Sequence, residues 1–175
     1  GEKAAGTGGP ISVPVGEAAL GRLFNVLGDT LDGKEPLAKG TPRLPIHRAP
    51  PSFDEQTTKA EVCETGIKAI DSMIPIGRGQ RELIIGDRGT GKTTVAIDAI
   101  LNQKAEPKES RPVCIYVSIG QKESKTARLV QQLREAGALE YTIVVDAGAA
   151  APAALQYLAP FAGAAIGEYF MDKGQ

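Results

Sequence analysis

Apolar residues occur in two kinds of pattern along the second half of this chain. Continuous apolar runs, which are typical of strands buried on both faces, cover residues 82–85, 113–119 and 141–145. Apolar positions at helical spacing predict helices over residues 93–101, 124–136 and 153–170. This alternation of strands and helices predicts an α/β fold with a mostly parallel sheet.

The ends of the predicted helices carry local signals. Ser124 is expected to cap the start of the second helix, and Gly137 is expected to stop it. The third helix is rich in alanine, and we expect interruptions at Pro160 and Gly163.

The first part of the chain is rich in turn-forming residues. Short strands are predicted over residues 11–15 and 23–27, an extended connection over 42–45, and a short helix over 65–73. In that helix Ile67, Ile70 and Met73 share one face, and Pro75 ends it. We expect a flexible lead-in over 1–9 and one domain over 10–175, in which residues 10–64 are rich in strands and turns and 65–175 form the α/β core.

Composition narrows the range of partners. The 175 residues include 20 basic and 21 acidic side chains, which give a net charge of −1. The chain also has only four tyrosines and four phenylalanines on which bases could stack. We therefore expect no nucleic acid partner. No apolar run approaches membrane-spanning length, so we expect no membrane contact and a cytoplasmic-type soluble protein. Cys63 and Cys114 are expected to be reduced, and His47 has no neighbouring ligands for a metal.

The segment from Gly86 to Thr93, here named the phosphate loop, carries the chemistry. It has the spacing glycine, four residues, Gly-Lys-Thr, between a predicted strand and a predicted helix. This context directs backbone N–H groups and a helix N-terminus at one anion, while Lys92 reaches the outer phosphates and Thr93 ligates Mg²⁺. The expected ligand is ATP or ADP with Mg²⁺, bound by Gly86, Asp87, Arg88, Gly89, Thr90, Gly91, Lys92, Thr93 and Thr94.

Several longer segments resemble the alpha subunit of rotary ATP synthases: residues 75–93, 114–122, 141–145, 155–160 and 167–170. Residues 7–16 and 20–22 lean towards the beta subunit of the same enzymes, so the chain resembles a chimera, a consensus or an inferred ancestor. The resemblance implies a P-loop NTPase (RecA-like) core that binds Mg-ATP or Mg-ADP. It also implies a family that assembles as alternating hexamers in the peripheral part of a membrane-bound rotary complex.

The chain departs from that family at positions important for hydrolysis. Gln121 stands where catalytic subunits carry a glutamate that polarises water, and Gly89 stands where alpha subunits usually carry glutamine. In the family, the aspartate that holds Mg²⁺ follows a strand beyond the position of Gln175, so we expect a core truncated before the Walker B strand. The absent strands would leave a gap in the sheet. Either the remaining strands close up in a new order or a second copy fills it.

These features favour a nucleotide-binding module with little or no hydrolysis, acting as a monomer or small homo-oligomer. One alternative is a weakly active ATPase in which Asp146 or Glu123 substitutes for the missing acid, with Asp146 also a candidate Mg²⁺ ligand. Another is a folded scaffold with negligible affinity, and a third is a motor driven by nucleic acid, which the neutral charge disfavours. The base preference stays open.

Overall fold

The computed structural model describes residues 5–6, 8–56, 59 and 61–175, so most of the expected lead-in over 1–9 lies outside them. Three parallel strands form the central sheet in the order β2-β7-β6. The strands are β2 (Leu23–Asn25), β6 (Cys114–Ile119) and β7 (Thr142–Ala147), with β7 in the middle. Cys114 pairs with Thr142 at one end of β6, and Ile119 pairs with Ala147 at the other. The predicted α/β fold with a parallel sheet is therefore confirmed.

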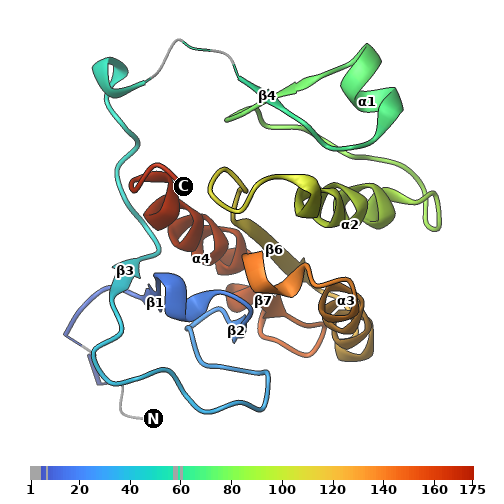
Figure 1. Cartoon of the computed structure of the whole chain (residues 1–175). Helices are drawn as coiled ribbons and strands as arrows, with labels where there is room; N and C mark the ends of the chain where they lie inside the picture. Colours follow the sequence, from blue (N-terminus) through green and yellow to red (C-terminus); the bar gives the residue numbers. More distant parts are fainter. Residues whose placement is uncertain (1–4, 7, 57–58, 60) are drawn as a thin grey trace.

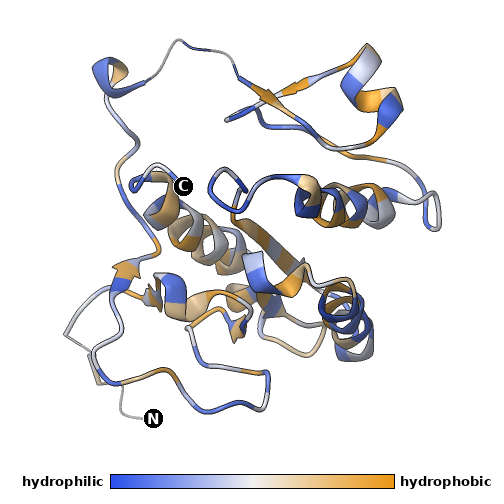
Figure 2. Ribbon diagram, viewed as in Figure 1, coloured by the Kyte–Doolittle hydropathy of each residue, from blue (hydrophilic) through white to orange (hydrophobic). Residues whose placement is uncertain are grey.

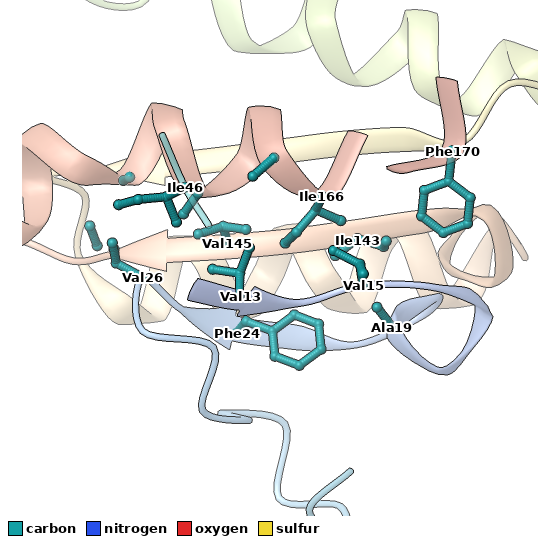
Figure 3. Packing of buried hydrophobic residues seen from close by; sticks show 14 residues of the cluster. Val13, Val15, Ala19, Phe24, Val26, Ile46, Ile143, Val145, Ile166 and Phe170 are labelled. Atoms are coloured by element: carbon teal, nitrogen blue, oxygen red, sulfur yellow. The ribbon is translucent and has the colours of Figure 1, made fainter. Parts of the chain in front are cut away.

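Helices cover both faces of this sheet (Figure 1). On one face, Ile143 and Val145 of β7 pack with Ile166 and Phe170 of α4 (Ala153–Met171), as Figure 3 shows. On the other face, Val144 packs with residues of α2 (Lys92–Asn102) and α3 (Glu123–Glu135). Figure 2 shows α3 as a largely hydrophilic helix, consistent with a single buried stripe formed by Thr126, Leu129, Val130 and Leu133.

Two small antiparallel sheets flank the central one. β1 (Ser12–Pro14) pairs with β3 (Arg43–Pro45), so the predicted extended connection over 42–45 forms part of a strand pair. β4 (Val62–Cys63) pairs with β5 (Ile76–Gly77). In the sequence, α1 (Lys68–Met73) lies between these two strands. Short 3₁₀ turns lie at Glu17–Ala19, Phe53–Glu55, Gln103–Ala105 and Leu139–Tyr141.

The predicted strand over residues 82–85 was wrong. Residues 81–86 are neither helix nor strand, and the side chains of Leu83 and Ile85 are 78% and 82% exposed. A strand needs a neighbouring edge for its N–H and C=O groups, and no described strand pairs with this segment. The helix predicted over residues 65–73 forms over Lys68–Met73 as α1, but its apolar face is not buried, since no residue of α1 is buried and Met73 is 79% exposed.

The strand predicted over residues 113–119 forms as β6, but its predicted burial on both faces is only partial. In the described part of the chain β6 pairs only with β7 and forms an edge of the sheet, so Cys114 to Val117 are only half-buried. Both cysteines are free, as expected. Burial raises the pKa of the Cys114 thiol to about 12, which keeps it protonated and unreactive at neutral pH.

α4 runs without interruption through Pro160 and Gly163, contrary to the predicted break. A Cβ on Gly163 would lie 2.4 Å from Val117 Cγ2, so the glycine lets α4 approach β6 closely. The packing of α4 on the sheet outweighs the low helix propensity of both residues. α3 also starts differently from the prediction, because its N-cap residue is Lys122 rather than Ser124 and no side chain caps it. Gly137 follows its end with a φ of +72°, as expected for a helix stop.

Candidate functional site

The phosphate loop turns sharply at its glycines before entering α2. Gly89 and Gly91 have φ angles of +83° and +90°, a region that residues with a side chain rarely adopt. A Cβ on Gly86 would lie 2.9 Å from Thr90 Oγ1, so this glycine lets the two ends of the loop approach each other. Thr90 Oγ1 in turn donates a hydrogen bond to the Asp87 carbonyl at 2.8 Å. The glycines of the motif are thus required by the shape of the loop.

Lys92 closes this loop on itself. Its Nζ donates a hydrogen bond to the Gly86 carbonyl at 2.6 Å and another to the Asp87 carbonyl. The ammonium thereby joins the first residues of the loop to the start of α2 and fixes a positive charge at the loop. An ammonium has three N–H donors. The third donor makes only a long hydrogen bond, with Lys92 Nζ 3.5 Å from Thr90 Oγ1, which a phosphate oxygen would readily replace.

The N-terminus of α2 is open to an anion. Gly91 is its N-cap residue, and no side chain caps the helix. The backbone N–H groups of Lys92, Thr93 and Thr94 in the first turn have no acceptor within the helix. Together with the helix dipole, such groups favour a negative ligand.

A cavity of about 200 Å³ adjoins this helix start. It lies among α2, β6 and α3, and we name it the α2–α3 cavity. Its wall is formed by Thr93, Thr94, Ile97, Asp98, Tyr116, Ser118, Gln121, Lys125, Thr126, Arg128, Leu129 and Gln132. The structure therefore brings three predicted site residues, Thr93, Thr94 and Gln121, to one cavity.

Comparison with known proteins identifies the family of this chain. Residues 66–175 match the model of the ATP synthase alpha/beta family, nucleotide-binding domain. This chain belongs to the ATP synthase alpha/beta family. Subunit alpha 1 of Nitrosomonas eutropha is 55% identical over 169 residues, which are 97% of this chain and 32% of that protein. Subunit alpha of Clostridium botulinum is 55% identical over 170 residues, 97% of this chain and 33% of that protein. Subunit alpha of Phocaeicola vulgatus is 57% identical over 165 residues, 94% of this chain and 31% of that protein.

The chain thus spans about a third of the length of these ATP synthase alpha subunits. Their similarity reaches well into the residues before 66, since it covers 97% of the chain. The resemblance of residues 7–16 and 20–22 to beta subunits stays a prediction. Among the described residues, no helix is long and apolar enough to cross a membrane.

The two acidic candidates of this ATP synthase family member, Asp146 and Glu123, both lie beside Gly148. Asp146, near the end of β7, accepts a hydrogen bond at 2.9 Å from Thr126 Oγ1, which lies 2.9 Å from Ser118 Oγ. Because the single Thr126 hydroxyl proton goes to Asp146, Ser118 is the donor to Thr126. Neither Asp146 nor Glu123 belongs to the cavity wall. In the described part of the chain, no three His, Cys, Asp or Glu residues form a group that could hold a metal ion.

The far end of α2 is firmly anchored. Asn102 Nδ2 donates a hydrogen bond to the Thr65 carbonyl at 2.9 Å, and Gln103 Nε2 donates one to the Glu64 carbonyl at 2.8 Å. Tyr141, just before β7, donates its hydroxyl to the Ile100 carbonyl at 3.0 Å. Burial raises the pKa of Tyr141, so this donor keeps its proton. These contacts hold the helix that carries the phosphate loop.

Sequence reasoning missed the residues of the cavity wall that come from β6 and α3. Tyr116, Ser118 and Thr126 contribute to it, as do the cationic residues Lys125 and Arg128. Lys125, Arg128 and Gln132 follow one another at helical spacing, so they share one face of the predicted helix. The sequence thus predicts that these residues share a face, but it does not show that this face lies opposite α2.

Proposed function

We propose that this chain is a Mg²⁺-dependent module that binds ATP or ADP and hydrolyses it slowly or not at all. The observation that carries this proposal is the closed phosphate loop at the uncapped start of α2. Lys92 ties the loop carbonyls together, while the first-turn N–H groups of α2 are available to an anion. Membership of a nucleotide-binding domain family supports the same ligand class.

Thr93 fits a role at Mg²⁺. It lies in the first turn of α2 and lines the cavity next to the loop, and a hydroxyl is one of the hard oxygen donors that Mg²⁺ accepts. When bound, Mg²⁺ neutralises part of the phosphate charge. Asp146 suits this role less well, since one of its oxygens already accepts from Thr126 and it lies outside the cavity wall.

The residues near the cavity favour binding over hydrolysis. Gln121 lines the cavity, and its neutral amide cannot act as a general base near pH 7. Asp98 is the sole acidic residue of the cavity wall. A substitute acid at Asp146 or Glu123 would have to act from outside that wall, so a weakly active ATPase is the less favoured alternative.

Calorimetric titration with ATP, ADP and GTP, with and without Mg²⁺, tests the binding proposal. Lys92→Ala removes the charged donor of the loop, and we expect it to weaken nucleotide binding by about 1.5–3 kcal/mol. Lys108→Ala is the control, because Lys108 is an exposed lysine that lines a different cavity. Unchanged affinity in Lys92→Ala would reject the site, and no binding by the unaltered chain would favour the scaffold alternative.

A phosphate-release assay with saturating Mg-ATP tests the absence of hydrolysis. We expect turnover far below about 1 s⁻¹, the low end of ordinary enzyme rates. Gln121→Glu is expected to restore little, because a water-orienting group is one of several parts that phosphoryl transfer needs. A turnover near that rate that depends on Lys92 would show that Asp146 or Glu123 acts as the acid.

We also infer that the chain by itself is a monomer or small homo-oligomer. Among the described residues, neither the outer edge of β6 nor the apolar segment 82–85 is paired with a strand, which gives two copies the means to exchange strands. Light scattering at micromolar concentration measures the assembly state. A hexamer in that measurement would contradict the inference.

A further inference from the structure

The α2–α3 cavity gathers positive charge on both of its walls. On one side lies the first turn of α2, with Thr93 and Thr94 at the positive end of the helix dipole. On the other side lies α3, which contributes Lys125 and Arg128, three residues apart on one helix face. Asp98 is the one acidic residue of the wall, so cations outnumber anions among the residues that line the cavity.

Neither of these two cations is neutralised within the described part of the chain. The ion pairs there join Arg22 to Asp32, Arg48 to Glu168 and Asp172, and Lys59 to Glu61. Asp98 forms no ion pair with Lys125 or Arg128, although all three line the same cavity. Two uncompensated cations beside the positive end of a helix repel one another, and an anion bound between them would relieve this repulsion.

We propose that Lys125 and Arg128 bind the terminal phosphate of a nucleoside triphosphate held by the phosphate loop. This inference rests on the proposed function, because it requires the inner phosphates to lie on the loop. The third phosphate of the chain would then lie beyond Thr93 and Thr94, in the α2–α3 cavity. The planar guanidinium of Arg128 suits two phosphate oxygens at once, and Lys125 adds a point charge.

A diphosphate lacks the group that these cations would contact. The two residues therefore act as specificity determinants that favour ATP over ADP. Their role is distinct from that of Lys92, which would contact both nucleotides.

The test compares ATP and ADP affinities by calorimetry in Lys125→Gln, Arg128→Gln and the double variant. Each single substitution removes a hydrogen bond to a charged group, so we expect ATP binding to weaken by about 10-fold or more. ADP affinity should stay within about 2-fold of the unaltered chain, given its lack of that contact. Arg134→Gln is the matched control, since Arg134 is exposed on the same helix, outside the cavity wall. Arg128→Lys keeps the charge and should retain part of the preference for ATP.

The outcomes separate this inference from the proposed function. If the unaltered chain binds neither nucleotide, the proposed function fails and this inference fails with it. If it binds both, unchanged ATP affinity in the double variant overturns this inference alone. Equal losses for ATP and ADP also overturn it, because they would indicate a general loss of attraction to anions. Both side chains are exposed, so the variants are expected to keep the thermal stability of the unaltered chain.

Discussion

The strand at the centre of the sheet and the segment that leads into the phosphate loop have similar sequences but opposite environments. β7 contains Ile143, Val144 and Val145, and each of these side chains is 0% exposed. The segment 82–85 contains Leu83, Ile84 and Ile85, which are 78%, 45% and 82% exposed. β7 has a strand on each side and a helix over each face, whereas segment 82–85 has no neighbouring strand among the described residues. An apolar run therefore indicates a tendency to pair, and the pairing itself depends on residues far away in the sequence.

The largest expected difference between the two regions is in the cost of removing one apolar side chain. Ile143→Ala should lower the free energy of unfolding by about 2–5 kcal/mol, because it leaves a cavity in a fully packed site. Ile85→Ala should change it by less than about 0.5 kcal/mol, because that side chain already lies in solvent. Urea unfolding followed by circular dichroism measures both. A cost above about 2 kcal/mol for Ile85→Ala would show that segment 82–85 is packed in solution, for instance against a second copy.

Two glycines of α4 sharpen the comparison within the packed region. Gly163→Ala places a Cβ 2.4 Å from Val117 Cγ2, and we expect overpacking to destabilise the fold by about 1–3 kcal/mol. Gly167→Ala meets Ile115 Cγ1 at an ordinary 3.6 Å, so the better helix propensity of alanine should stabilise the fold by about 0.5–1 kcal/mol. Thermal unfolding of the two variants should thus shift in opposite directions. Shifts of the same sign would mean that α4 does not approach β6 as closely as described.

The smallest expected difference concerns the two cysteines, one in the central sheet and one in the small sheet that precedes segment 82–85. Cys114 lies in β6, and burial raises its pKa to about 12, so its thiolate is scarce at pH 8. Cys63 lies in β4, beside α1, and we expect iodoacetamide to modify it first. Mass spectrometry of the native protein follows both sites, and Cys63→Ser isolates the slower one. Both should react at similar rates in denaturant, and faster modification of Cys114 in the native state would contradict its burial.

Much of the core was predictable from local patterns. The apolar runs over 113–119 and 141–145 correspond to β6 and β7, and the glycine–lysine motif leads into α2 as expected. Gly163 shows why other features were not predictable. The sequence presents it as a helix breaker, while its role depends on Val117, which is distant in the sequence.

The candidate site also contains residues that local patterns predict and residues whose role depends on distant parts of the chain. The phosphate loop, Thr93 and Gln121 follow from the motif and the resemblance, and the structure places Thr93 and Gln121 on one cavity wall. Lys125 and Arg128 could not be assigned, because their position opposite α2 depends on how two helices pack on one face of the sheet. Asp146 was a reasonable candidate at the end of a strand, yet its hydrogen bond from Thr126 gives it a structural partner.

The hydrogen bonds at the C-terminal end of α2 fix that end of the helix and leave its N-terminal end without a comparable anchor among the described residues. Its 11 residues span about 16 Å, and Asn102 and Tyr141 hold the end opposite the phosphate loop. The segment before the loop has no strand partners in the described part of the chain. The position of the loop is therefore fixed mainly by α2, which follows it. A small rotation at the Asn102 end is therefore magnified at the loop. The accuracy with which this protein positions its phosphate loop therefore depends on residues at the opposite end of α2.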